Sequence, residues 1–315
     1  MKKDMINREV VEGRLYQHSL ELKTVQNQAS ANYGKEFITG TIDIATDEEG
    51  LNVIPVHYTY ITETTSTGKK NVTFGVLKSI IDGVGKTWIT DGKDAALKVR
   101  ATPSLALNDF YNREGELVSA RRNEGGFVNT INDLAPEAER NTFRCDMVIT
   151  SVATVEADEE NGIPADYIKV KGAIFNFRKD ILPVEFTCHD EGGMGYFESL
   201  DASPTNPIFT EVRGHIISNV ITREIEEESA FGSASVRTVS RTVREWCIDW
   251  ARPVEYEFGA DDTLTAEELK EAIQNREVYL AEIKKRQEEY QAHSAATTTQ
   301  TAASKAKVPQ GGFQF

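Results

Sequence analysis

Two stretches of the chain, about 130 residues apart, carry the same succession of glycine, aliphatic and proline residues. GTIDI begins at Gly40 and IPVHY at Ile54, while GAIFNF begins at Gly172 and LPVEF at Leu182. Further matches, in the same order, are F-x-x-L at Phe74 and Phe197, and VR at Val99 and Val212. A repeat of this length is the size of a domain, which predicts two tandem copies of one fold. Chance similarity between two β-rich segments is the alternative.

Each copy shows the same order of expected elements. In the first copy, alternating apolar residues predict strands over 13–22, 37–46, 52–61, 96–107 and 117–128, and helical spacing predicts a helix over 72–81. In the second copy, strands are expected over 143–155, 167–177, 181–187, 208–225 and 236–250, with a short helix near 196–200. Five strands with a helix between the third and fourth describe the OB-fold, a small barrel that binds single strands across strands two and three. The predicted fold class is therefore mainly β, with two tandem OB-like five-stranded barrels.

Over residues 10–252 the chain resembles the tandem-OB single-stranded DNA-binding proteins, especially the acidic ones encoded by bacteriophages. The resemblance implies sequence-tolerant binding of single-stranded DNA in phage DNA replication or recombination, without catalysis and without a cofactor. The alternative is a structural or adaptor β-protein, for example virion-associated, that binds other proteins, because OB barrels also serve that role.

The domain boundaries follow from composition. We expect barrels over 1–135 and 136–256, an acidic amphipathic helix over 257–292 and a disordered tail over 293–315.

The absence of a long apolar run predicts a soluble, cytoplasmic protein. The net charge of −15 argues against coating of duplex DNA by bulk attraction, although a locally basic groove remains compatible with it.

In the second copy, strand alternation places cations and aromatic residues on one face. Ile168, Val170 and Ile174 share the predicted inner face, which leaves the outer face to Lys169, Lys171, Phe175 and Phe177. Aromatic rings stack on any base while lysines follow the phosphates, so this pattern predicts a single-strand platform, and Arg178 and Lys179 extend it through the next turn. The alternative is that the two phenylalanines pack beneath a neighbouring helix or domain.

Other candidate contacts are more dispersed. In the first copy, Phe37 is the one predicted stacking residue on the outer face of the second strand, since Tyr58 and Tyr60 share the parity of the core residues. The remaining candidates are cations in predicted loops or on the last strands, namely Lys35, Lys69, Lys70, Arg121, Arg122, Arg237 and Arg241. Each is either a groove residue or a solvated surface charge, and acidic residues 224–228 offer partners that would neutralise the last two.

Signatures of catalysis and metal binding are weak. The run Gly83-Val84-Gly85-Lys86-Thr87 resembles a phosphate-binding loop, but Ile80 stands where the first glycine is required. Cys145, Cys188 and Cys247 show neither zinc-site nor disulfide spacing. We therefore expect no enzyme, no metal and no cofactor.

The C-terminal region predicts interactions with other proteins. A capping box at Thr265 opens a helix to about Tyr290, which either docks on its own domain or mediates self-association. The tail ends in Phe313 and Phe315, an aromatic tip that resembles the partner-recruiting end of bacterial and phage single-strand binders. Unlike those tails, it carries no acidic residues beside the tip, and a plain disordered end is the alternative.

Overall fold

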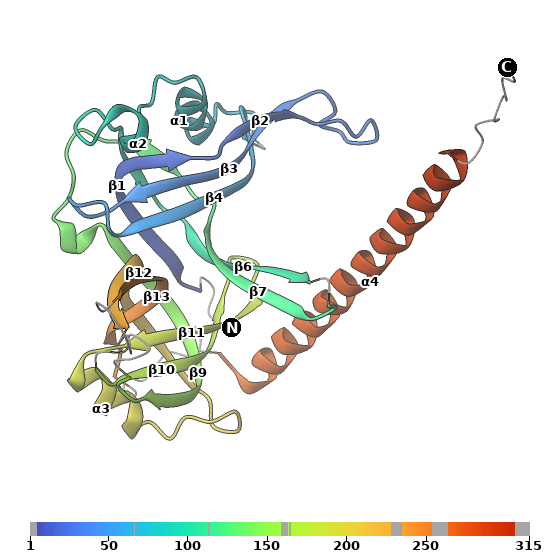
Figure 1. Cartoon of the computed structure of the whole chain (residues 1–315). Coiled ribbons are helices and arrows are strands. Elements are labelled where there is room, and N and C mark those ends of the chain that lie inside the picture. Colours follow the sequence, from blue (N-terminus) through green and yellow to red (C-terminus); the bar gives the residue numbers. More distant parts are fainter. Residues whose placement is uncertain are drawn as a thin grey trace, which may run out of the picture. The chain divides into compact units, whose positions relative to one another are not determined.

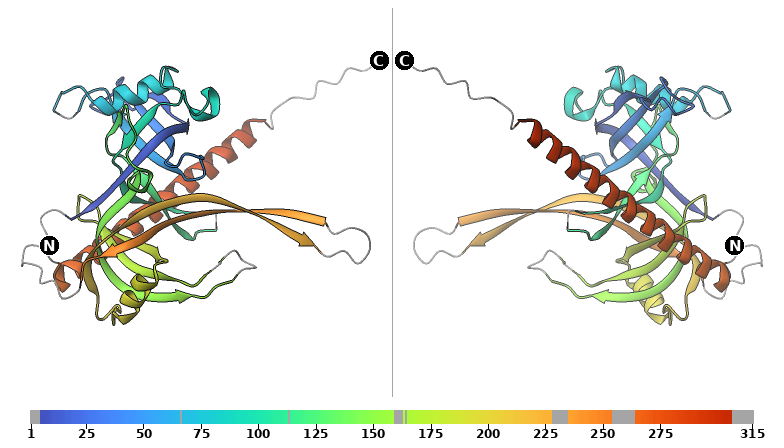
Figure 2. Two further views of the ribbon diagram at one scale, coloured as in Figure 1. Left: turned by 90° about the vertical axis from the view of Figure 1, so that its left-hand side faces the viewer. Right: turned by 90° about the vertical axis from the view of Figure 1, so that its right-hand side faces the viewer.

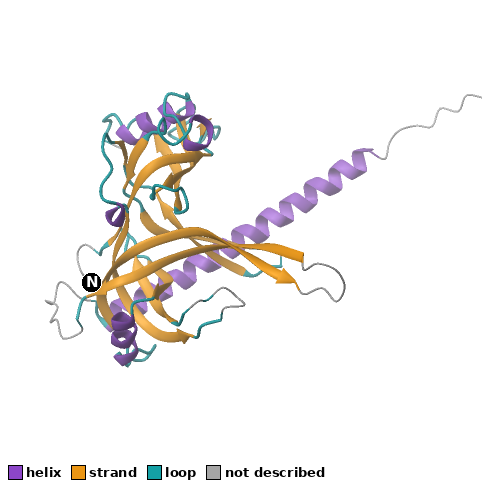
Figure 3. Ribbon diagram, turned by 60° about the vertical axis from the view of Figure 1, so that its left-hand side comes forward, coloured by secondary structure: helices purple, strands orange, loops and turns teal. Residues whose placement is uncertain are grey.

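The computed structural model describes residues 5–65, 67–112, 114–158, 163, 165–227, 235–253 and 264–305. Within these ranges, the side chains at 220–227, 235–242, 266 and 290–305 are outside the description. Strands dominate the chain (Figure 3). One compact unit contains both barrels apart from residues 107–120, and a second contains residues 107–120 together with the C-terminal helix.

The first barrel is a closed sheet built from eight strand segments. Its strands are β1 (Asn7–His18), β2 (Glu21–Thr24), β3 (Glu36–Ala45), β4 (Val53–Thr62), β5 (Lys98–Ala101), β6 (Ser104–Tyr111), β7 (Leu117–Glu124) and β8 (Val128–Thr130) (Figure 1). β1 pairs with β3, β3 with β4, β4 in parallel with β7, and β7 with β6, while β5 returns to β1. With β5 and β6 counted as one interrupted strand, the order is that of an OB barrel, in which β3 and β4 are strands two and three.

The second barrel repeats this closure. It is built from β9 (Asn141–Val155), β10 (Tyr167–Phe175), β11 (Ile181–Cys188), β12 (Ile208–Glu227) and β13 (Ser235–Ala251). β9 pairs with β10, β10 with β11, β11 in parallel with β13, β13 with β12, and β12 with β9. β12 and β13 continue as a long two-stranded ribbon (Figure 2). The predicted pair of OB-like barrels is thus confirmed, and the structure adds a parallel contact between the third and fifth strands of each barrel.

A short helix follows the third strand in each barrel. α1 (Val72–Ile81) begins after Asn71, whose side chain accepts a hydrogen bond from the Thr73 amide, and it buries Phe74, Leu77 and Ile80. α3 (Glu191–Ser199) is capped in the same way by Asp190. The remaining short helices are α2 (Trp88–Asp91) and η1 (Glu137–Glu139).

The repeated glycines have a steric role. A Cβ atom on Gly40 would lie 2.3 Å from the Ser19 carbonyl oxygen, and one on Gly172 would lie 1.9 Å from that of Val148. Gly40 on β3 passes closely over the turn between β1 and β2, and Gly172 on β10 passes closely over β9, so no other residue fits at either position. This close approach accounts for the glycine in both copies of the repeat.

The two barrels are joined within one continuous sheet. β1 of the first barrel pairs with β9 of the second from Asn7 opposite Cys145 to Val11 opposite Asn141. Across this junction the Trp246 indole donates a hydrogen bond of 2.8 Å to the buried Glu9 carboxyl group. The Arg121 guanidinium lies 5.1 Å from the Trp246 ring centroid. The barrels therefore share a buried polar and aromatic contact in addition to backbone pairing.

The second compact unit holds helix α4 (Ala266–Lys305) against the tip of the β6–β7 hairpin. Arg276 forms a two-bond ion pair with Asp109 at 2.9 and 3.2 Å, and Gln287 donates to the Tyr111 carbonyl oxygen at 3.2 Å. Arg276 and Gln287 are thus contacts through which this helix docks on the hairpin. No helix in the described part of the chain has the length and apolar composition needed to cross a membrane.

Helix α4 is assigned as far as Lys305, and the disordered tail expected over 293–315 stays a prediction. Extending a formed helix adds one backbone hydrogen bond per residue, and the alanines in this stretch have the highest helix propensity. Phe313 and Phe315 lie outside the described residues. The division of the chain into domains at 135, 256 and 292 stays a prediction.

Candidate nucleic-acid interface

The outer face of β3 and β4 carries a pair of aromatic rings in contact. The rings of Phe37 and Tyr60 lie 4.7 Å apart at an interplanar angle of 36°. They meet because the register shifts between Ile38 and Gly40, so that β4 holds one extra residue opposite β3. The shift turns Tyr60 out of the core parity, and its side chain is 44% exposed. The result is a preformed aromatic surface on strands two and three.

Lysines surround the end of the sheet where this pair lies. Lys35 directly precedes β3, and Lys69 and Lys70 lie in the loop that leaves the end of β4, held by a bridge between Thr64 and Lys70. All three side chains are exposed, and the Lys35 ammonium donates to the Asn32 amide oxygen at 3.0 Å. The three predicted lysines of the first barrel and its aromatic pair are therefore brought to one end of the same face.

The outer face of β10 and β11 repeats this chemistry with one added carboxylate. Lys169 and Lys171 point outward as predicted, and both pair with Glu185 on β11, at 3.2 and 3.3 Å. Burial opposes ionisation of Glu185, but the hydrogen bonds from Lys169 and Lys171 hold its pKa below the usual value. One carboxylate thus partly neutralises two lysines on this face.

An aromatic pair lies beside these lysines, at the start of β10 and the end of β11. Tyr167, which shares the parity of Lys169 and Lys171, stacks on His189 with ring centroids 4.9 Å apart and an angle of 27°. Sequence reasoning missed Tyr167, although its position two residues before Lys169 was a sufficient signal. It also missed Tyr60, whose exposure depends on the bulge and has no signal in strand alternation.

Two predicted stacking residues differ from expectation. Phe175 is 0% exposed and belongs to the core, because the end of β10 is covered on its outer side as well, where Ala173 and Ile181 are also buried. Phe177 lies beyond β10 in the turn to β11, where it is 88% exposed and has the Arg178 guanidinium 5.2 Å from its ring centroid. The prediction of a shared strand face for both rings was therefore wrong, and Phe177 alone is available to a ligand.

The turn after β10 is shaped by Asn176. Its side-chain oxygen accepts hydrogen bonds from the amides of Arg178 and Asp180, both at 2.9 Å. Lys179 adopts a φ angle of 67°, in the left-handed region that non-glycine residues seldom occupy. This fixed turn presents Phe177, Arg178 and Lys179 to solvent.

The other predicted arginines do not form one basic surface. Arg121 is partly buried between the barrels, where it donates to the Glu185 carbonyl oxygen, and burial lowers the pKa of its guanidinium. Arg122 forms an ion pair with Glu124 at 2.8 Å. Arg121 is thus a structural contact, which corrects its assignment as a groove residue. Arg237 and Arg241 lie on β13 opposite Ile225 and Ile221, and their side chains are outside the described part of the chain.

A family model describes most of this chain. The model of the family called YorF matches residues 7–286. The chain belongs to the YorF family. No curated protein matches it. Among solved structures, this YorF-family chain is similar to a deletion mutant of the single-stranded DNA binding protein from Thermus aquaticus, with 10% sequence identity, a TM-score of 0.46, and coverage of 82% of this chain and 98% of that one.

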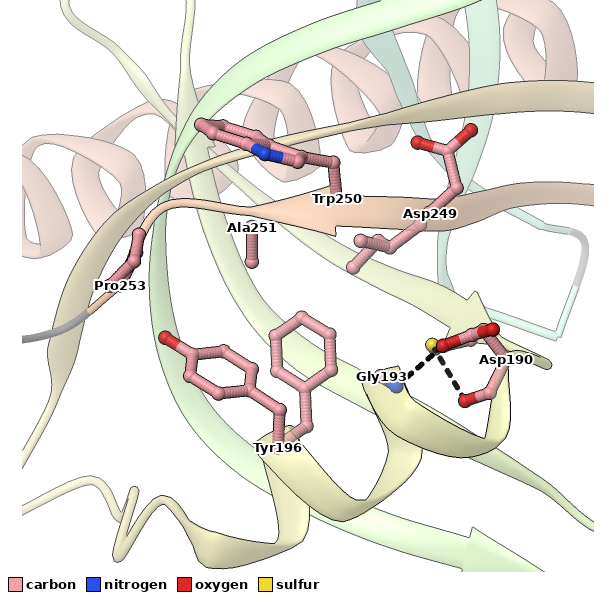
Figure 4. Close-up of a pocket in the computed structure, with 10 residues that line it drawn as sticks. Asp190, Gly193, Tyr196, Asp249, Trp250, Ala251 and Pro253 are labelled. Atoms are coloured by element: carbon pink, nitrogen blue, oxygen red, sulfur yellow. Dashed lines mark hydrogen bonds between the residues drawn. The ribbon is translucent and has the colours of Figure 1, made fainter.

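A separate small pocket lies in the second barrel between α3 and β13 (Figure 4). Its volume is about 260 Å³, and apolar side chains such as Phe197 and Ile248 line much of it. Asp190 at its edge is already engaged in capping α3. Among the described residues no group of His, Cys, Asp and Glu is arranged to hold a metal ion.

Replacing Glu185 with glutamine is expected to tighten binding of labelled oligo-dT about fivefold at low salt, because Lys169 and Lys171 lose the carboxylate that competes with phosphate, an exchange worth ~1 kcal/mol. The Glu185 backbone carbonyl, to which Arg121 donates, is unchanged by the substitution. Fluorescence anisotropy measures the affinity. Glu288→Gln on α4 removes an equal charge from an exposed site as the matched control. Equal or weaker binding by the Glu185 variant contradicts the assignment of this face.

Proposed function

We propose that this protein binds single-stranded DNA without sequence preference and without catalysis, across the outer faces of β3–β4 and β10–β11. The observation that supports this most is a repetition. Each barrel places an aromatic pair with one exposed ring, together with lysines, on or directly beside its second and third strands, Phe37 with Tyr60 in one barrel and Tyr167 with His189 in the other. Stacking is tolerant of base identity and lysines follow the phosphates, so the pattern suits an unpaired strand of any sequence.

The acidic composition is compatible with this function. The net charge of −15 acts over the whole surface, but charges farther away than about 8 to 10 Å are screened at physiological salt. Binding at the two faces depends on the nearby lysines. Overall negative charge also disfavours non-specific attraction to duplex DNA, which favours selection of exposed single strands during replication or recombination, the role we propose in a phage.

The direct test is a fluorescence-anisotropy titration of the full chain with labelled oligo-dT over a range of salt concentrations. We expect binding at low salt that weakens as salt rises. Lys169→Gln combined with Lys171→Gln is expected to lower the slope of log K against log salt by about 1.4, since each phosphate that is no longer neutralised accounts for about 0.7. Lys284→Gln with Lys285→Gln, on exposed positions of α4, is the matched control.

The outcomes separate the two candidate functions. Absence of binding to oligo-dT at low salt removes the proposal and leaves the adaptor role, which stable protein assemblies indifferent to DNA would support. Binding with an unchanged salt slope in the Lys169 and Lys171 variant shows that the strand takes another path.

A further inference from the structure

Three arginines and a tryptophan lie opposite one another in a row across β1, β9, β12 and β13. None of these is the second or third strand of a barrel. Arg8 on β1 pairs with Arg144 on β9, Arg144 pairs with Arg213 on β12, and Arg213 pairs with Trp250 on β13. We call these four residues the arginine row. Neighbouring strands lie about 4.8 Å apart, and like charges directly opposite each other destabilise a sheet. Three arginines in one row therefore require compensation.

The compensation is a single buried carboxylate. Glu211, with 2% of its side chain exposed, accepts two hydrogen bonds of 2.8 Å from Arg144, one of 2.8 Å from Arg213 and one of 2.9 Å from Arg252. Burial alone would raise the pKa of Glu211, but these guanidiniums lower it to about 2. Glu211 holds the guanidinium groups of Arg144 and Arg213 from the buried side, while 45% of each of these two arginine side chains stays exposed. Positive charge is left in excess on a rigid surface.

A β-bulge adds an aromatic ring to the end of the row. The register shifts between Arg213 and Gly214, so Asp249 is an extra residue on β13. Asp249 and Trp250 both rise from β13 on the side opposite Ala251 and Tyr196 (Figure 4). Trp250 is 40% exposed, and the Arg213 guanidinium lies 4.3 Å from its ring centroid. Asp249 is held by His215 at 2.7 Å. The bulge thus turns the ring outward beside the arginines.

The first barrel shows that the fold does not require this arrangement. At the matching positions Glu12 on β1 lies opposite Arg100 on β5, and the two form an ion pair at 2.9 Å. In the second barrel Arg144 stands where Glu12 stands in the first. At these positions the first barrel therefore pairs one arginine with one carboxylate, whereas the second barrel sets several arginines around the single carboxylate of Glu211.

The row also borders a depression. A cavity of about 350 Å³ is lined by Arg8, Thr142, Arg144, Arg213 and His215, among others. Guanidinium donors fit phosphate oxygens, and an exposed ring next to them offers a stacking surface for a base. An acidic polypeptide would match the charges but makes less use of Trp250.

From this geometry we infer that the arginine row is a second binding site for the phosphodiester backbone of single-stranded DNA, reached when a long strand passes around the second barrel from the β10–β11 face. This inference rests on the proposed function. It makes binding length-dependent, because a short oligonucleotide is held by the faces of strands two and three alone.

The test compares labelled oligo-dT of about 8 and about 40 nucleotides, lengths chosen from the ~4–16 nucleotides that one OB-fold covers. One variant combines Arg8→Gln with Trp250→Leu, which leaves every hydrogen bond of Glu211 in place. A second combines Arg144→Gln with Arg213→Gln, and thermal unfolding checks that it folds. The control is Lys285→Gln with Arg286→Gln on exposed positions of α4. We expect both row variants to bind the long oligonucleotide about tenfold more weakly with a reduced salt slope, and the short one as the wild type does.

The possible failures are distinguishable. If the wild-type protein binds neither oligonucleotide, the proposed function itself fails. If it binds both, and a folded Arg8 and Trp250 variant binds the long one with unchanged affinity and salt slope, the inference about the row is overturned while the function stands. Poly-glutamate is titrated in parallel. If the row variants lose binding to poly-glutamate but bind both oligonucleotides as the wild type does, the ligand of the row is an acidic polypeptide instead.

Discussion

Replacing Phe37 and Tyr60 together with alanine is expected to weaken binding of labelled oligo-dT by roughly 100-fold at low salt, since each base–aromatic stack is worth about 1 to 3 kcal/mol. The two rings form one continuous surface at 4.7 Å, and their removal takes the aromatic platform from the first barrel. Fluorescence anisotropy over a protein titration measures the loss. The salt slope should change little, because neither residue carries charge.

The matched control is Phe127→Ala, which removes an exposed ring from the same barrel outside β3 and β4. It should bind oligo-dT as the wild-type protein does. Tyr60→Phe, which keeps the ring, should remain within about twofold of the wild type. An unchanged affinity in the folded Phe37 and Tyr60 variant would show that DNA does not cross this face. Thermal unfolding checks that the variant is folded, so that a loss of affinity is not caused by misfolding.

The order of elements could be predicted from sequence because it depends on local patterns. Alternating aliphatic residues such as Ile168 and Val170 define a strand with one buried face, and the tight approaches at Gly40 and Gly172 recur in both copies. The outward positions of Lys169 and Lys171 follow from the same alternation. These features need no knowledge of what packs against the strand.

Features that depend on register or on a second layer could not be predicted. A single extra residue in β4 reverses the side of the sheet on which Tyr60 lies, and one in β13 does the same for Trp250. Phe175 has the parity of an exposed residue but is covered from outside. The arginine row joins residues far apart in the chain, so it exists only once four strands are in register.

The junction between the barrels illustrates the same limit. Glu9 looks like an ordinary outer charge on a strand, and Trp246 like a core residue, yet they meet through a buried hydrogen bond. Arg121, predicted as a groove residue, lies over the same ring. Nothing in the local pattern of any of these segments predicts the partner, because the contact depends on how the two barrels are joined through β1 and β9.

Glu9 gives the largest expected effect on stability. Burial raises the pKa of its carboxyl group from 4.5 to about 8, against the opposing effect of the Trp246 hydrogen bond. The folded-state pKa lies above the unfolded one. Near neutral pH the folded protein therefore holds a proton on Glu9 that the unfolded chain has already released. This contribution to stability is complete below about pH 4.5 and is lost as pH rises through about 8. The free energy of unfolding should therefore fall across that window.

Glu9→Gln is expected to remove this fall, because glutamine keeps the hydrogen bond from Trp246 and does not ionise. The variant should match the wild type near pH 5 and exceed it by a few kcal/mol near pH 8.5, at about 1.4 kcal/mol per pKa unit. Urea unfolding followed by tryptophan fluorescence over this pH range gives both profiles. Glu288→Gln, an equal substitution on the exposed surface of α4, should keep the wild-type profile. Parallel profiles for the wild type and the Glu9 variant would mean that this carboxyl group is ionised in the folded protein, and the junction between the barrels would then hold a buried charge.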